Sequence, residues 1–305
     1  MWTLQYWPAR PNSAILVTRK IECAVISALE EPDRGGCDLF YAKLPVVTSY
    51  LAISLILGAV AGLANVFGGV IVSARAWSRT FLSYFIALGS GFMLATALTE
   101  MIPESLKLSP PEAPSSAALL ILVGYFIVHF FEHSWPGHFH FGEETHADEF
   151  LNSRVAYTAL GGLLIHTFFD GVAITSGFLI SRWLGTVIFG AVILHNIPEG
   201  FTMASIMKAA HKSVRAGLWS VSALGVSRLA GIVAMAAAHG FAVEQGRPMA
   251  ARTVSCGLAI SGGVTLYVAA SDLIPEVNKM PGRAITLTVA GGVALVILLR
   301  CLFLT

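Results

Sequence analysis

Charged residues are scarce in this sequence of 305 residues. Asp, Glu, Lys and Arg make up 12% of the chain and hydrophobic residues 55%, whereas soluble globular domains typically contain about 25% charged residues. The net charge of +1 lacks the surplus of basic residues that is typical of nucleic-acid binding. The composition therefore predicts an integral, multi-pass membrane protein and gives no indication of a nucleic-acid partner.

Cysteine is also rare, and its spacing carries no motif. The four cysteines show no CxxC pattern, which predicts neither a disulfide framework nor a thiolate metal site. We interpret them as small apolar residues. Any metal site must then use nitrogen and oxygen ligands. The cysteines are Cys23, Cys37, Cys256 and Cys301.

Long hydrophobic runs take the place of the missing charge. Because a membrane-spanning helix needs about 20 apolar residues, we predict an all-α bundle of eight transmembrane helices over residues 45–305. Residues 1–44 contain basic residues and prolines and are interpreted as a poorly ordered extension or a short helix. The predicted spans are residues 47–72, 79–102, 116–134, 155–180, 183–207, 215–239, 252–275 and 283–303.

Two polar inserts interrupt the fourth and fifth predicted spans. His166 stands four residues before Asp170, His195 stands four residues before Glu199, and a glycine follows each acid. Residues four apart share a helix face, and ionisable groups within a membrane mark functional sites. Imidazoles and carboxylates suit Zn, Fe, Mn and similar ions, so these four residues are predicted to bind a divalent metal. A structural hydrogen-bonded pair between helices is the alternative for each insert.

Three neutral residues are further candidates for the site. Asn196 adds an amide carbonyl beside His195, and Thr167 is its weaker counterpart beside His166. Met93, in the second span, is a candidate lining residue with a soft sulfur atom. A methionine packed in the core explains Met93 as well, because methionine commonly fills gaps there.

Arg228 lies near the middle of the sixth predicted span. An arginine at this depth is rare and needs a partner. We hypothesise that Arg228 pairs with Asp170 or Glu199, so that its charge takes the place of a second cation. Snorkelling of the side chain towards the interface is the alternative.

The inserts belong to a wider internal repeat. His195 follows His166 by 29 residues, and the second-span stretch ending in Pro103 resembles the seventh-span stretch ending in Pro275, 172 residues later. Both pairs join spans of opposite direction, which predicts an inverted repeat of the kind found in secondary transporters. The same logic implies pairing of the first span with the eighth and of the third with the sixth. Chance similarity of small-residue helices is the alternative.

Histidines also cluster between the third and fourth spans. Five of the nine histidines of the chain fall within residues 129–149, and a histidine-rich tract can collect metal. The loop at residues 135–153 is therefore a candidate auxiliary metal-binding segment, with a solvated polar loop as the alternative. The auxiliary candidates here are His133, His138, His140 and His146.

With these residues placed, the chain resembles the ZIP (Zrt-, Irt-like protein) family of divalent metal transporters over about residues 47–303. The fifth-span motif matches in full, whereas the fourth-span motif has Thr167 and Asp170 in place of the common Asn and Glu. The stretches that carry the resemblance are His195-Asn-Ile-Pro-Glu-Gly200, His166-Thr-Phe-Phe-Asp-Gly171, Gly91-Phe-Met93 and Ile274-Pro275-Glu276.

The resemblance implies eight helices in a 3+2+3 arrangement, outside termini, a cytosolic histidine-rich loop and uptake of metal into the cytosol. It also implies a homodimer, and we expect the protein in the plasma (inner) membrane. Two departures bear on a second metal position: Ser227 stands where some members have a glutamate, and Ser271-Asp272 stands where some have His-Glu. Asp272 and Glu276 are kept as auxiliary candidates.

Two other classes of protein compete with a transporter. A membrane-embedded zinc hydrolase also holds metal with His and Asp, but it needs an open metal position with an activated water, and the sequence has no HExxH motif. A non-catalytic metal sensor is the third class. We predict a transporter without a resident cofactor, with zinc, iron, manganese or cadmium as cargo and with lipid around the helices.

Overall fold

A computed structural model of the chain describes residues 38–74, 79–110, 113, 115–134, 153–279 and 282–303. Contacts divide the chain into two units, Met1–Val46 and Val47–Thr305. The second unit contains all the predicted spans. The predicted extension at residues 1–44 and the loop at residues 135–153 fall almost entirely outside the described residues.

Helices make up nearly all of the described residues, and those residues contain no strand. Eight helical segments among them are long and apolar enough to cross a membrane. This confirms the predicted all-α fold with eight spans, whose ends differ from the predicted ones by a few residues. The elements are α2 (Asp38–Ala74), α3 (Arg79–Thr96), η1 (Ala97–Met101), α4 (Ile102–Lys107), α5 (Ser115–Ser134), α6 (Ser153–Ile180), α7 (Arg182–Ala209), α8 (Val214–Glu244), α9 (Arg247–Tyr267), η2 (Val268–Leu273), α10 (Ile274–Asn278) and α11 (Arg283–Phe303).

Two spans contain a short π-helical segment that the sequence did not predict. The segment η1 joins α3 to α4 just before Pro103, and η2 joins α9 to α10 just before Pro275. Proline lacks an N–H group, and its ring crowds the carbonyl four residues earlier. A π-type turn relieves this conflict by widening the helix locally. The two segments occupy matching positions of the second and seventh spans.

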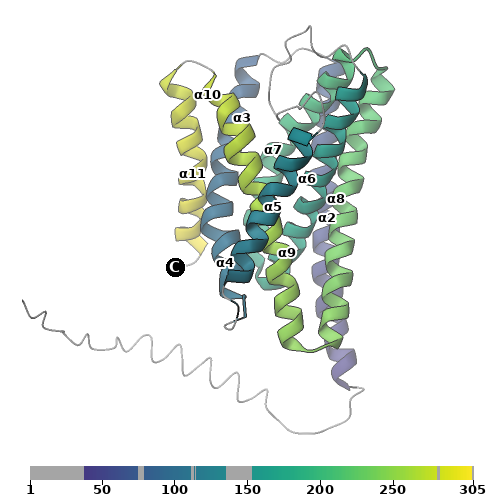
Figure 1. Cartoon of the computed structure of the whole chain (residues 1–305), viewed down its shortest axis with the longest axis vertical. Coiled ribbons are helices and arrows are strands. Elements are labelled where there is room, and N and C mark those ends of the chain that lie inside the picture. The colour runs from purple at the N-terminus through teal and green to yellow at the C-terminus, as the bar shows by residue number, and fades with distance from the viewer. Residues whose placement is uncertain are drawn as a thin grey trace, which may run out of the picture. The chain divides into compact units, whose positions relative to one another are not determined.

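The helices that carry the polar inserts, α6 and α7, pack against each other and against helices from both ends of the chain. α6 contacts α8 and α9, and α7 contacts α3 and α8. Farther out, α3 lies beside α11 and α5 beside α9, as Figure 1 shows. This enclosure removes the inserts from the lipid-facing surface.

Glycines set the crossing of α6 and α8. A Cβ atom at Gly171 would overlap the carbonyl oxygen of Arg228, and one at Gly231 would overlap the carbonyl oxygen of Phe168. Only glycine permits backbones to approach this closely. The crossing brings the backbone of Arg228 directly against the glycine that follows Asp170.

α2 and α7 make the same crossing with their own glycines. A Cβ atom at Gly200 would overlap the carbonyl oxygen of Asn65, and one at Gly68 would overlap that of Ile197. These four residues match those of the α6–α8 crossing at constant offsets, 29 residues from α6 to α7 and 163 residues from α2 to α8. Asn65 is therefore the counterpart of Arg228 on α2.

The outer crossings repeat in the same manner. α3 crosses α11 at Gly91 and Gly292, and α9 crosses α5 at Gly263 and Gly124. The repeated contacts therefore pair the first span with the sixth and the third with the eighth. These contacts contradict the sequence-based pairing of the first span with the eighth and of the third with the sixth, which is wrong. The sequence could not decide between the two pairings, because each of them joins spans of opposite direction. The inverted relation between the two halves stays a prediction.

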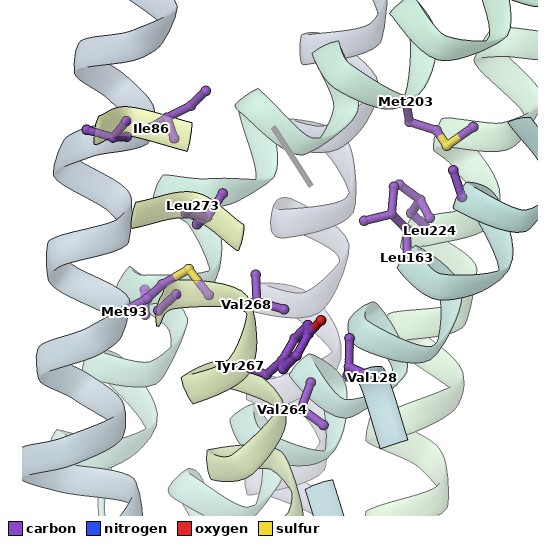
Figure 2. Packing of buried hydrophobic residues seen from close by; sticks show 14 of the residues in the cluster. Ile86, Met93, Val128, Leu163, Met203, Leu224, Val264, Tyr267, Val268 and Leu273 are labelled. Carbon is purple, nitrogen blue, oxygen red and sulfur yellow. The ribbon is translucent and has the colours of Figure 1, made fainter. Parts of the chain in front are cut away.

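The largest hydrophobic cluster lies beside the inserts. It includes Met93 of α3 and Val268 and Leu273 of η2, which face one another in Figure 2. Met93 is fully buried there. Its surroundings are those of a packed core methionine, and its role in lining a pathway stays a prediction.

Candidate metal site

His166 and Asp170 share one face of α6, and His195 faces them from α7. The Nε2 atoms of His166 and His195 are 3.3 Å apart. The Oδ2 atom of Asp170 lies 3.4 Å from Nε2 of His195 and 3.7 Å from Nε2 of His166. All three side chains are buried. The three donor atoms lie within 4.8 Å of one another, as ligands of one metal ion do.

A hydrogen bond from the ring nitrogen that points away from the cluster fixes the orientation of His195. Its Nδ1–H group donates to the carbonyl oxygen of Ala191 at 2.8 Å, which leaves the lone pair of Nε2 directed at the cluster. Two imidazole nitrogens that face each other at this distance need a shared proton or cation, since their lone pairs otherwise repel. The Nδ1 atom of His166 has no hydrogen-bond partner among the described residues.

Arg228 of α8 reaches into the same group of side chains. It is fully buried, and its Nη2 atom lies 3.3 Å from Oδ2 of Asp170 and 3.7 Å from Oε2 of Glu199. Its two terminal nitrogens also donate to Asn65 and Asn196, each at 2.9 Å. The hypothesised ion pair is confirmed, and it involves both acids rather than one of them.

Glu199 lies apart from the imidazole cluster. Its Oε2 atom accepts a 2.6 Å hydrogen bond from the Nδ2 atom of Asn65 and also faces Arg228. Its Oε1 atom has no hydrogen-bond partner among the described residues. The structure thus brings three of the four predicted principal ligands together and holds the fourth against an amide and a guanidinium.

The two residues that follow the histidines are already engaged. Asn196 donates to the carbonyl oxygen of Ala61 at 2.8 Å and accepts from Arg228 through its side-chain oxygen. The hydroxyl of Thr167 donates within its own helix, to the carbonyl oxygens of Leu163 and Leu164. The donor groups of both side chains are thus engaged, and the side-chain oxygen of Asn196 is held by Arg228.

A cavity of about 20 Å³ adjoins His166 on the side of the α5 C-terminus, and its walls include Asp272 and Glu132. A void of this size holds about one water molecule. Glu132 accepts a 2.8 Å hydrogen bond from the hydroxyl of Tyr267, and Asp272 is buried within η2. The auxiliary candidate Asp272 therefore lies on the wall of a small, mainly apolar space that also touches His166.

The remaining auxiliary candidates lie outside this group of contacts. His133, exposed at the end of α5, stacks on His129 with ring centroids 4.2 Å apart. Glu276 belongs to α10, and its side chain is outside the described part of the structure. His138, His140 and His146 also lie outside the described residues.

Sequence reasoning missed Asn65, which bridges Arg228 and Glu199. The internal repeat of the sequence would have identified Asn65. Asn65 and Gly68 on the first span match Arg228 and Gly231 on the sixth at an offset of 163 residues. A search that paired the first span with the sixth would have found this polar residue in the middle of a span.

The chain is similar in sequence to known metal transporters. A family model described as ZIP Zinc transporter matches residues 142–300, slightly more than half of the 305 residues. Zinc transporter ZIP9-B of Xenopus laevis is 21% identical over 70% of this chain and 80% of its own length. Metal cation symporter ZIP14 of Mus musculus is 21% identical over 68% of this chain and 55% of its own length. Zinc transporter ZIP9 of Xenopus tropicalis is 22% identical over 70% of this chain and 80% of its own length.

Proposed function

The chain belongs to the ZIP family of metal transporters, and we propose that it carries a divalent metal cation, zinc foremost, into the cytosol by way of His166, Asp170 and His195. The observation that carries the proposal is the buried cluster of two imidazole nitrogens and one carboxylate oxygen between α6 and α7. Members of this family are transporters, so the reading as a membrane-embedded hydrolase is set aside. The metal is cargo rather than a resident cofactor.

The donor set favours borderline metal ions. Imidazole suits Zn, Fe, Cu and Ni, whereas sites made of oxygen alone suit Mg, Ca and Mn. Two imidazoles and one carboxylate therefore favour zinc, with iron, cadmium and manganese as weaker cargo. Three protein ligands leave room for water or for a fourth ligand that changes as the ion passes, which a carrier needs in order to release its ion.

The cavity beside His166 supports a route to the side that carries the histidine-rich loop. Its lining includes Asp272 and Glu132 together with His166. Carboxylates along such a route lower the energy of a cation that has left its ligands. In this proposal Asp272, Glu276 and the histidines at 133, 138, 140 and 146 are auxiliary binding positions, with the route ending in the cytosol.

The outward faces of the spans support lipid or a second copy of the chain as neighbours. Large hydrophobic side chains are exposed there, including Leu63 at 67%, Phe130 at 69% and Trp219 at 76%. Apolar surface of this kind is stable next to apolar neighbours and not in water. A homodimer in the plasma or inner membrane is the form we propose, and crosslinking in native membranes tests it.

Zinc flux into proteoliposomes tests the transport proposal. We expect His195→Ala and Asp170→Asn to reduce flux to the rate of protein-free vesicles, because each removes one of three converging ligands. His211→Asn is the matched control: His211 is exposed at a turn with a φ of 54°, a backbone conformation that asparagine tolerates. Flux in the two site variants equal to that of the control would refute the proposed site.

A further inference from the structure

Arg228 lies beside the three proposed ligands and is not one of them. It is among the largest fully buried side chains, with no exposed surface, and four side chains from three other helices surround its guanidinium. A charge this deep needs nearby carboxylates and hydrogen-bond acceptors, and both terminal nitrogens of Arg228 have them, whereas its Nε atom has no hydrogen-bond partner among the described residues. The four partners are Asn65, Asp170, Asn196 and Glu199.

The guanidinium competes with a metal ion for one atom. Oδ2 of Asp170 is the oxygen that faces both imidazoles, and it is also the oxygen 3.3 Å from Nη2 of Arg228. An ion bound by the imidazoles and this oxygen would share the oxygen with a cation that is tethered to α8. Arginine stays charged under all ordinary conditions, so the competition is permanent.

Charge limits the number of ions that the group can hold. Two carboxylates and one guanidinium leave a net charge of about −1 when both imidazoles are neutral. One divalent ion changes this to about +1, which is comparable in magnitude. A second divalent ion would leave about +3 in a space enclosed by helices, where unbalanced charge is strongly unfavourable.

The same arrangement sorts ions by ligand preference. Both carboxylates contact Arg228, and Glu199 also accepts from Asn65. The Nε2 atoms of His166 and His195 are the donors that make no contact with the guanidinium in the described contacts. An ion that gains most from imidazole loses less by this competition, while an ion that depends on carboxylates must compete with the guanidinium for both of them.

We propose that Arg228 is a specificity-determining residue: it acts as a tethered cation that restricts the site to one divalent ion and favours zinc over manganese. The inference rests on the proposed function, because it assumes that the imidazole cluster binds the cargo. Removing the guanidinium frees two carboxylates at once. The variant then offers the oxygen-rich site that manganese prefers.

Metal binding to the purified full-length protein in detergent tests this proposal. Zinc alone, manganese alone and the two in competition are titrated, and bound metal per chain is counted. We expect one zinc ion per chain in the wild type, and in Arg228→Gln a zinc-to-manganese preference at least about tenfold weaker, the lower end of the effect of residues that support metal ligands. Arg300→Gln is the control: the side chain of Arg300 is half-exposed and pairs with Glu100 at 3.3 Å, so this substitution should change neither quantity.

Arg228→Lys covers the case in which the glutamine variant does not fold. Lysine keeps the charge but has a single ammonium that cannot hold two carboxylates and two amides. It should keep one ion per chain and weaken the preference by a smaller factor. An unchanged preference in whichever variant folds overturns the proposal. His195→Ala in the same titration separates the proposed metal site from the proposed role of Arg228. If His195→Ala binds zinc as the wild type does, the proposed function fails. If His195→Ala loses zinc but the Arg228 variant keeps the wild-type preference, only the role of Arg228 is overturned.

Discussion

The two halves of the site carry the same motif and hold their acids differently. On α6, Asp170 faces two imidazoles and the guanidinium of Arg228. On α7, Glu199 faces an amide and the same guanidinium, apart from the imidazoles. The motifs match in spacing but differ in residue type, Thr167 against Asn196 and Asp170 against Glu199, and a different helix crosses each of them. α8 presents Arg228 to the α6 half, and α2 presents Asn65 to the α7 half.

This contrast teaches that the crossing helices decide what the two inserts do. The four glycines at the two crossings match at constant offsets, so the backbones meet in the same way. The residue that lies against the glycine of each insert differs: it is Asn65 at Gly200 and Arg228 at Gly171. Two matching crossings thus support an asymmetric site, with the candidate metal ligands gathered near one carboxylate and a permanent cation shared between both.

We expect the largest change in zinc affinity at the two acids, and we expect them to differ. Asp170→Asn removes a ligand, and we expect zinc affinity to fall by more than about a hundredfold, the upper end of what supporting residues alone contribute. Glu199→Gln should lower affinity by only about tenfold, because Glu199 supports Arg228 and Asn65. Isothermal titration of both variants checks the order. Equal losses would mean that both acids bind the ion in the same way.

The next effect concerns the glycine crossing. Gly231→Ala on α8 places a methyl group against the carbonyl oxygen of Phe168, and overpacking of this kind costs about 1–3 kcal/mol. Gly240→Ala on the same helix is the control, since nothing lies within 4 Å of its added Cβ. The first variant should unfold at a lower temperature, and the second should match or exceed the wild type because alanine favours helix. A thermal unfolding assay in detergent compares them, and similar melting of the two variants would contradict the close crossing.

A smaller effect is expected at Asn65. Asn65→Ala removes one acceptor of Arg228 and one donor to Glu199, and leaving buried polar groups unpaired costs about 1–3 kcal/mol. Zinc affinity should change less than in Asp170→Asn, because Asn65 contacts neither imidazole in the described hydrogen bonds. Stability and zinc affinity measured on one preparation check this. A loss of affinity as large as that of Asp170→Asn would place Asn65 among the ligands.

The smallest effect should come from the histidine-rich segment. Deleting residues 136–149 removes His138, His140 and His146 but leaves the imidazole cluster intact. We expect the apparent affinity for zinc to change while the maximal flux stays within about twofold, in keeping with an auxiliary metal-collecting role. Zinc flux as a function of zinc concentration separates the two quantities. Complete loss of transport would make the segment essential.

The fold was largely predictable because each span is a long apolar run, and a membrane leaves such a run few alternatives to a helix. The proximity of His166 and Asp170 was predictable because a helix fixes which residues share a face, and the matching insert on the next span pointed to His195. The π segments were not anticipated, since a proline predicts a local disturbance but not its form. The hydrogen bond from Asn65 to Glu199 was not predictable, because Asn65 is a neutral residue far away in the sequence and no local pattern reveals which helix crosses α7.

Zinc X-ray absorption spectroscopy on the purified protein tests the central claim most directly, because it reports the ligands of the bound ion. The account predicts two imidazole nitrogens in the wild type, with the remaining scatterers being oxygen. It predicts one imidazole in His195→Ala if any zinc is retained, and two in Glu199→Gln. A wild-type spectrum without imidazole ligands, or one that does not change in His195→Ala, would contradict a metal site built on His166, Asp170 and His195.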